Sequence, residues 1–262
     1  MKLYLALTPL LLCLSSCVSL PGTDKKAFII VPEATEISMG LQAFNEIKEK
    51  EKISTDKRLN AILQRVGSRI SAVAPKNYKW EFVLIDSKEM NAFCLPGGKV
   101  AFYTGILPVL ENEAAMAVVM GHEIAHAVLR HGAQRMSQQI AAQGILIGAD
   151  QTVLKNNEHR ALWLGALGLG TQVGVMLPFS RSHETESDVE GLRYAAAAGY
   201  DPTEAARFWT RFAKATQSGG GTPTFLSTHP SSASRIENLK RLEVESGQLY
   251  EKSPKYGLGE KL

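Results

Sequence analysis

Cysteine is scarce in this sequence, and its charges nearly balance. The 262 residues include three cysteines, and the formal net charge is only +3. Cys13 would leave with an export segment and Cys17 would carry lipid, so that Cys94 alone remains and an intramolecular disulfide framework is excluded. The chain has no long basic run and no interleaved aromatic stripe, which argues against nucleic acid as a partner.

The N-terminus has the features of a bacterial lipoprotein signal. Lys2 precedes an apolar run from Leu3 to Leu14, which has the length of a signal-peptide core and is short for a membrane span. The run ends in Leu14-Ser15-Ser16-Cys17, which resembles a lipobox with Cys17 as the lipidated residue. The alternatives are an ordinary signal peptide cleaved near Ser16 and an uncleaved anchor.

The rest of the chain shows no internal repeat and no break in composition, which favours a single folded domain. We predict a signal peptide over residues 1–17, a tether over 18–34, the folded domain over 35–246 and a flexible tail over 247–262.

Hydrophobic periodicity predicts two helices followed by a small sheet. Apolar residues recur at helical spacing over Asp56 to Ala74, and Ile37 to Lys50 forms the helix before it. Lys79 to Ile85 alternates as a strand does, and Asn91 to Leu95 and Lys99 to Tyr103 give two further strands around a Pro-Gly-Gly turn.

From Glu111 onward the sequence is helical, which makes the expected fold α+β, mainly helical, with a small mixed sheet of about three strands. Gly132 suits the end of the first helix of this part. Ala161 to Phe179 carries no charge, and a buried helix, or one that dips into the membrane surface, is favoured there over a span. The helices predicted are Ala114–Arg130, Ala133–Leu154, Ala161–Leu177, Arg181–Ala198, Pro202–Ala215 and Ser232–Glu245.

The motif His122-Glu123-Ile124-Ala125-His126 carries the chemistry. On a helix, His122 and His126 lie one turn apart on one face, so both imidazoles can bind one metal ion. Glu123 would then lie close to a water molecule bound to that ion, without being a ligand itself. This zincin arrangement needs one further protein ligand and an open position for water. Two helix-surface histidines are the alternative, but the apolar residues around the motif argue that it is buried.

The third ligand is expected in the helix that begins near Arg181. Glu184 and Asp188 are four residues apart, so one can bind the metal while the other orients a ligating histidine. Glu184 is the favoured ligand; His183 and Cys94 remain competing candidates. We expect Glu186 and Glu190 to form a solvated acidic face, and His131 and His159 to be surface residues.

The sequence resembles the gluzincin family that contains the CAAX prenyl endopeptidases, the HtpX heat-shock proteases and periplasmic outer-membrane quality-control peptidases. The likeness extends over about Thr35 to Leu242 and is nearest to the short periplasmic lipoprotein-type branch. The segments that carry it are Asn91-Ala92-Phe93, Leu95-Pro96-Gly97-Gly98, Gly121 to His126, Ser180-Arg181 with Glu184 and Asp188, and Thr228-His229-Pro230 with Arg235-Ile236. The resemblance implies Glu184 as the third zinc ligand and Asp188 as its support.

The expected activity is a zinc-dependent endopeptidase with one zinc ion per chain. Glu123 is the expected general base, and His229 or Arg235 would stabilise the oxyanion; His229 could instead occupy the open metal position in a resting state. A structural turn that caps the last helix is the alternative for both residues.

The family's substrates imply misfolded or misassembled envelope proteins, bound as an added strand along Asn91, Ala92 and Phe93. The implied location is the periplasmic face of a bacterial membrane, the outer membrane in particular, with its assembly machinery as a possible partner. Two rivals are an assembly or chaperone-like lipoprotein with a mainly structural zinc and a non-peptidase zinc hydrolase.

Overall fold

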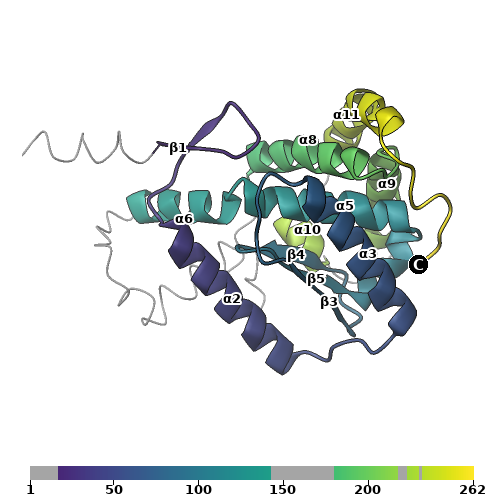
Figure 1. Ribbon diagram of the computed structural model, residues 1–262, viewed down its shortest axis with the longest axis horizontal. Coiled ribbons are helices and arrows are strands. Elements are labelled where there is room, and N and C mark those ends of the chain that lie inside the picture. The colour runs from purple at the N-terminus through teal and green to yellow at the C-terminus, as the bar shows by residue number, and fades with distance from the viewer. Residues whose placement is uncertain (1–16, 143–179, 218–222, 230–231) are drawn as a thin grey trace, which may run out of the picture.

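The computed structural model describes residues 17–142, 180–217, 223–229 and 232–262 of the chain (Figure 1). Helices surround a small sheet of β3 (Glu81–Ile85), β4 (Ala92–Leu95) and β5 (Lys99–Tyr103) in the order β3-β5-β4. β3 runs parallel to β5 and β4 runs antiparallel to it. The predicted α+β class with a mixed three-stranded sheet is therefore confirmed, and β4 is an edge strand of that sheet.

Helix α5 (Glu113–Val128) forms the centre of the fold. Asn112 caps it by accepting a hydrogen bond from the backbone N–H of Ala115 at 2.8 Å. Every residue of α5 is buried, as its alanine-, valine- and methionine-rich sequence requires of a helix that is apolar on all sides. It packs between β4, α3 (Lys57–Val73) and α8 (Arg181–Ala197).

Two glycines allow α5 and α8 to approach closely. A Cβ atom on Gly121 would lie 2.5 Å from the carbonyl oxygen of Gly191, closer than side chains allow. Because both positions lack a side chain, the backbones of the two helices meet. This contact brings the first turn of α8 beside the last two turns of α5.

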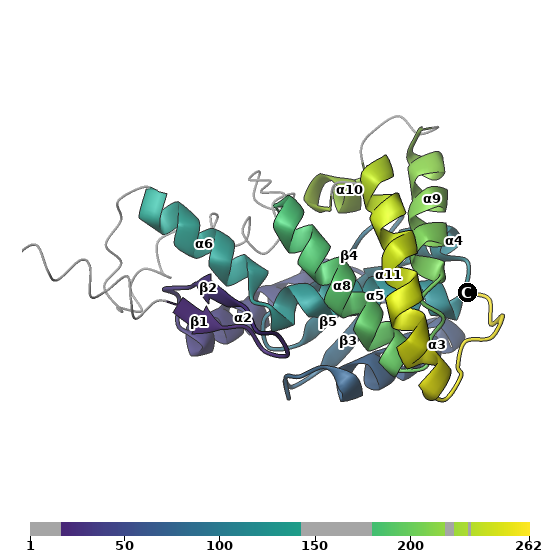
Figure 2. The same ribbon diagram turned by 90° about the horizontal axis from the view of Figure 1, so that it is seen from above.

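Most of the remaining elements cover the sheet and the α5–α8 pair, whereas the hairpin of β1 and β2 lies beside α6 (Figures 1 and 2). α2 contacts β4 and β5, whereas α9 and α11 pack against each other, α9 also against α5 and α11 against α8. These elements are β1 (Cys17–Ser19), β2 (Lys26–Phe28), α2 (Glu33–Lys50), the 3-10 turn η1 (Thr104–Ile106), α4 (Leu107–Leu110), α6 (His131–Ala142), α9 (Glu204–Gln217), α10 (Thr224–Thr228) and α11 (Ala233–Lys252).

The end of α5 differs from the prediction. Arg130, rather than Gly132, leaves the helical conformation, with φ of 56°, and α6 begins at the next residue. Buried contacts hold Arg130 there: its guanidinium pairs with Glu36 and donates to the carbonyl of Val31 at 2.9 Å. The later part of the predicted helix Ala133–Leu154, the predicted helix Ala161–Leu177 and His159 lie outside the described residues.

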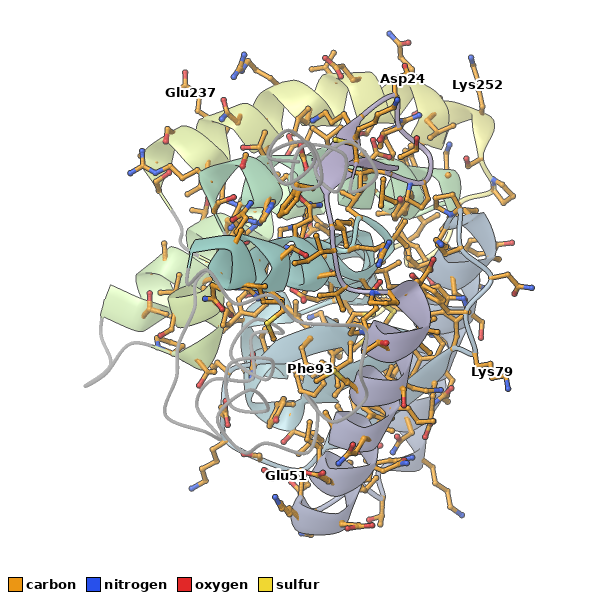
Figure 3. The ribbon with its side chains drawn as sticks, turned by 90° about the vertical axis from the view of Figure 1, so that its left-hand side faces the viewer. Asp24, Glu51, Lys79, Phe93, Glu237 and Lys252 are labelled. Carbon is orange, nitrogen blue, oxygen red and sulfur yellow. The ribbon has the colours of Figure 1, made fainter. Side chains whose placement is uncertain are left out.

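The C-terminal helix is longer than predicted. α11 continues past Glu245 to Lys252, with side chains such as Glu237 and Lys252 pointing outward (Figure 3). Beyond it, the N–H of Tyr256 donates to Gly199 and that of Leu262 donates to Glu111. The chain end therefore packs beside the start of α5.

In the part of the chain that the structure describes, no helix combines the length and the apolar composition that a membrane span requires. Cys17, the predicted lipid-carrying residue, is exposed at the start of β1. Residues 1–16 lie outside the described part.

Candidate metal centre

Four buried side chains converge where α5, α8 and the end of α10 meet. His122, His126, Glu184 and His229 each present one ligand atom, and these atoms lie within 4.8 Å of one another. The Nε2 atoms of His122 and His126 are 3.0 Å apart, because residues four apart on a helix share a face. The carboxylate Oε1 of Glu184 lies 3.3 Å from Nε2 of His126.

The position of Glu184 follows from the start of α8. Ser180 caps this helix by accepting a hydrogen bond from the N–H of His183 at 3.2 Å. Glu184 consequently falls in the first turn, the part of α8 that faces the two histidines. Against the raising effect of burial, His229 and Arg235 hold the pKa of Glu184 well below its usual value, so it carries negative charge.

The donor set fits a divalent metal ion. Two imidazole nitrogens and a carboxylate oxygen are the ligands that zinc takes in open sites. They are buried together, and a charged carboxylate in such a place needs a cation or hydrogen bonds to remain ionised. The opposite nitrogen of each α5 histidine is also engaged, which leaves both Nε2 atoms directed at the centre.

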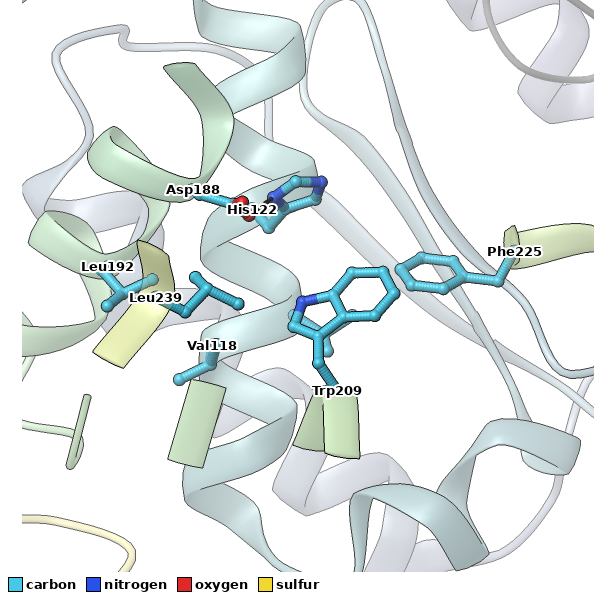
Figure 4. A pocket seen from close by; sticks show the side chains of 8 residues that line it. Val118, His122, Asp188, Leu192, Trp209, Phe225 and Leu239 are labelled. Carbon is cyan, nitrogen blue, oxygen red and sulfur yellow. Dashed lines mark ion pairs between the residues drawn. The ribbon is translucent and has the colours of Figure 1, made fainter. Parts of the chain in front are cut away.

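Asp188 supports the ring of His122 from behind. Its Oδ1 lies 3.0 Å from Nδ1 of His122, and a carboxylate can only accept this hydrogen bond. Burial lowers the pKa of His122, but the hydrogen bonds to Asp188 and Glu184 outweigh it and raise that pKa to about 9. His122 and Asp188 line a small pocket whose other side chains, including Trp209, Phe225 and Leu239, are apolar (Figure 4).

Arg235 joins the two carboxylates of α8. Its Nε and Nη2 lie 2.9 and 2.7 Å from the two oxygens of Asp188, and its Nη1 lies 2.6 Å from Oε2 of Glu184. The guanidinium also stacks over the ring of Trp209 at 4.0 Å. All three guanidinium nitrogens therefore face carboxylates.

Glu123 and His229 meet on the other side of the cluster. Nδ1 of His229 lies 3.0 Å from Oε1 of Glu184, and its Nε2 lies 3.4 Å from Oε1 of Glu123. Burial raises the pKa of Glu123 above its usual value, and its Oε1 forms no hydrogen bond with the described residues. His229 thus stands between the carboxylate at the centre and Glu123.

The competing third ligands lie elsewhere. The Cys94 thiol is buried on β4 and contacts the carbonyl of Leu95 at 3.6 Å. His183 points its Nε2 at Oε1 of Gln134, 3.2 Å away. Within the described residues, neither joins the group of converging ligands.

Three predictions about side chains near the site are wrong. His131 is fully buried and not on the surface, Glu190 is buried, and the partly buried Glu186 hydrogen-bonds to His131. The turn at Arg130 folds the chain back behind His126, which spacing along the sequence does not disclose.

Residues 54–243 match the sequence pattern of Peptidase family M48. The chain belongs to peptidase family M48. This confirms the resemblance to the gluzincins seen in the sequence, and the M48 segment contains all four residues of the cluster.

Named relatives agree with the M48 assignment. The chain is 37% identical over 179 residues to mitochondrial metalloendopeptidase OMA1 of Schizosaccharomyces pombe, covering 68% of this chain and 51% of that protein. It is 27% identical over 230 residues to the beta-barrel assembly-enhancing protease of Escherichia coli, covering 86% of this chain and 47% of that one. The chain therefore spans about half the length of these two relatives.

Proposed function

We propose that this protein is a zinc-dependent endopeptidase in which His122, His126 and Glu184 bind the metal. The observation that carries the proposal is the convergence of these three buried donors, with Glu123 beside them. Membership of family M48 and relatives named as metalloendopeptidases support the same activity.

Glu123 is the general base of the proposed reaction. His122, His126 and Glu184 would hold the zinc ion, which would supply Lewis acidity toward water and the scissile carbonyl. Glu123 takes a proton from the attacking water and passes it to the departing amine. Because burial raises its pKa, Glu123 holds this proton better than an exposed carboxylate does.

His229 closes the site in the arrangement described here. Its ring lies between Glu184 and Glu123, in the place that the attacking water of the proposed reaction would occupy. We interpret this as a resting state that opens when His229 moves away. A structural zinc with four protein ligands is the second candidate, because the same four side chains converge.

The contacts of Arg235 favour a positioning role over oxyanion stabilisation. Its nitrogens hold Glu184 and Asp188 in place and offset their charge. For substrate, the edge strand β4 with Asn91, Ala92 and Phe93 is our proposed pairing partner for an extended polypeptide.

The proposed location is the periplasmic face of a bacterial outer membrane, with misassembled envelope proteins as substrates. The exposed Cys17 and the name of the Escherichia coli relative, beta-barrel assembly-enhancing protease, support this location and a link to outer-membrane assembly. Cys17→Ala is expected to release the protein from membranes, measured by fractionation; an unchanged distribution would reject lipid anchoring.

The activity is tested by measuring bound zinc and the cleavage of a denatured protein. Glu123→Gln should keep one zinc per chain and lose cleavage, whereas Glu184→Ala should lose the metal. Glu251→Gln, at a side chain that is 77% exposed, is the matched control. Equal cleavage by the wild type and Glu123→Gln would reject the mechanism.

A further inference from the structure

His131 and the carboxylate of Glu186 lie behind His126 and are not among the four converging side chains. Nδ1 of His131 lies 3.0 Å from Nδ1 of His126, and Nε2 of His131 lies 3.1 Å from Oε2 of Glu186. The three side chains form a line that leads away from the metal centre. The line resembles the support that Asp188 gives His122, with one more imidazole inserted.

The donors and acceptors along this line follow from its outer end. An ionised carboxylate can only accept, so Nε2 of His131 carries the proton that it donates to Glu186. A neutral His131 ring then accepts at Nδ1, where the N–H of His126 Nδ1 donates. His126 is left with its lone pair on Nε2, which faces Glu184 and Nε2 of His122.

We propose that His131 and Glu186 are positioning residues that fix His126 in its metal-binding tautomer and orientation. This inference rests on the proposed zinc site and adds two residues to it. Carboxylate–histidine–metal chains orient ligating rings in this way, and loss of such a partner weakens metal binding.

The surroundings of His131 keep the line rigid. Its ring is fully buried and stacks on that of His183, with centroids 4.3 Å apart, while Ser187 Oγ lies 3.3 Å from its Nδ1. At the outer end, Nζ of Lys25 lies 2.8 Å from Oε1 of Glu186. Lys25 belongs to the β1–β2 hairpin, so the segment that follows Cys17 contacts Glu186, the outermost of the three aligned side chains.

The test is the zinc dissociation constant, measured by competition with a chromogenic chelator on the full-length purified protein. His131→Phe keeps an aromatic ring and removes both nitrogens, and it should weaken zinc binding by roughly 10- to 100-fold. Glu186→Gln should weaken it by about 10-fold. Glu190→Gln, the same change on the same helix at a residue paired with Arg193, is the control and should bind zinc as the wild type does.

The zinc affinity of a double variant, His131→Phe with Glu186→Gln, distinguishes a positioning role from a general loss of stability. If both residues act along one line, the double variant should bind zinc no more weakly than His131→Phe alone, because the inner link is already broken. Urea unfolding of the zinc-free proteins shows whether each variant folds, and Glu186→Gln decides the matter should His131→Phe be unfolded. Lys25→Met should change zinc affinity little, because exposed ion pairs contribute little.

Wild-type affinity in Glu186→Gln, or additive losses in the double variant, would overturn the inference. A wild-type protein that binds no zinc would instead overturn the proposed function, so the two failures are distinguishable.

Discussion

A Cβ atom placed on Gly191 would lie 2.6 Å from the backbone nitrogen of His122. His122, the first of the proposed metal ligands, is thus in backbone contact with α8, the helix that carries Glu184. The contact at Gly191 therefore holds α5 and α8 together and also sets the distance between His122 on α5 and Glu184 on α8.

Gly191→Ala is expected to push the two helices apart. Overpacking of this kind costs about 1–3 kcal/mol of unfolding free energy. Zinc affinity should fall as well, because Glu184 moves with α8. Gly247→Ala on α11 is the control: its added methyl meets nothing within 4 Å, and Ala favours the helix. Urea unfolding and chelator competition measure both effects; wild-type affinity in Gly191→Ala would show that the spacing is not critical.

Asp188→Asn should weaken zinc binding by roughly 10- to 100-fold, because the ring of His122 loses the carboxylate that accepts its Nδ1–H. Isothermal competition with a chelator gives the affinity directly. Asp86→Asn, at an exposed residue paired with Lys52, serves as the matched control. Unchanged affinity in Asp188→Asn would remove Asp188 from the site.

His229→Ala tests the resting state. If the closed arrangement holds about nine-tenths of the molecules, removing the imidazole should raise cleavage roughly tenfold while zinc stays bound. Initial rates on a denatured protein, with zinc content measured on the same sample, give the answer. A fall in cleavage would support the oxyanion role instead, and loss of zinc would support the structural site with four ligands.

The buried carboxylate of Glu113 should make stability depend on pH. Arg65 Nε lies 3.0 Å from it and the hydroxyl of Tyr200 lies 2.9 Å away. Burial alone would raise the pKa of Glu113, but these partners, Arg65 foremost, hold it below the usual 4.5. Because the folded pKa is lowered, the stabilisation is complete above pH 4.5 and is lost as the pH falls below it.

Glu113→Gln should therefore cost about 2 kcal/mol at pH 7 and flatten the loss of stability below pH 4.5. Urea unfolding of the zinc-free protein across this range measures it. If the unfolding free energy of Glu113→Gln falls below pH 4.5 as steeply as that of the wild type, other carboxylates cause the pH dependence.

Periodicity and motif spacing predicted the three strands of the mixed sheet, the central helix and the pair Glu184 and Asp188, because these depend on local pattern; the hairpin of β1 and β2 was not predicted. The position of His131 behind His126 could not be predicted, since the left-handed turn at Arg130 that places it there depends on tertiary contacts with Glu36. The sequence predicted that the last helix ends at Glu245, whereas α11 continues to Lys252.

A crystal structure of the zinc-loaded protein, with anomalous data collected on both sides of the zinc edge, tests whether His122, His126 and Glu184 bind the metal. One anomalous peak per chain is expected, bonded to Nε2 of His122, Nε2 of His126 and the carboxylate of Glu184. A protein that holds zinc elsewhere, or a peak that Glu184 does not contact, would contradict this expectation.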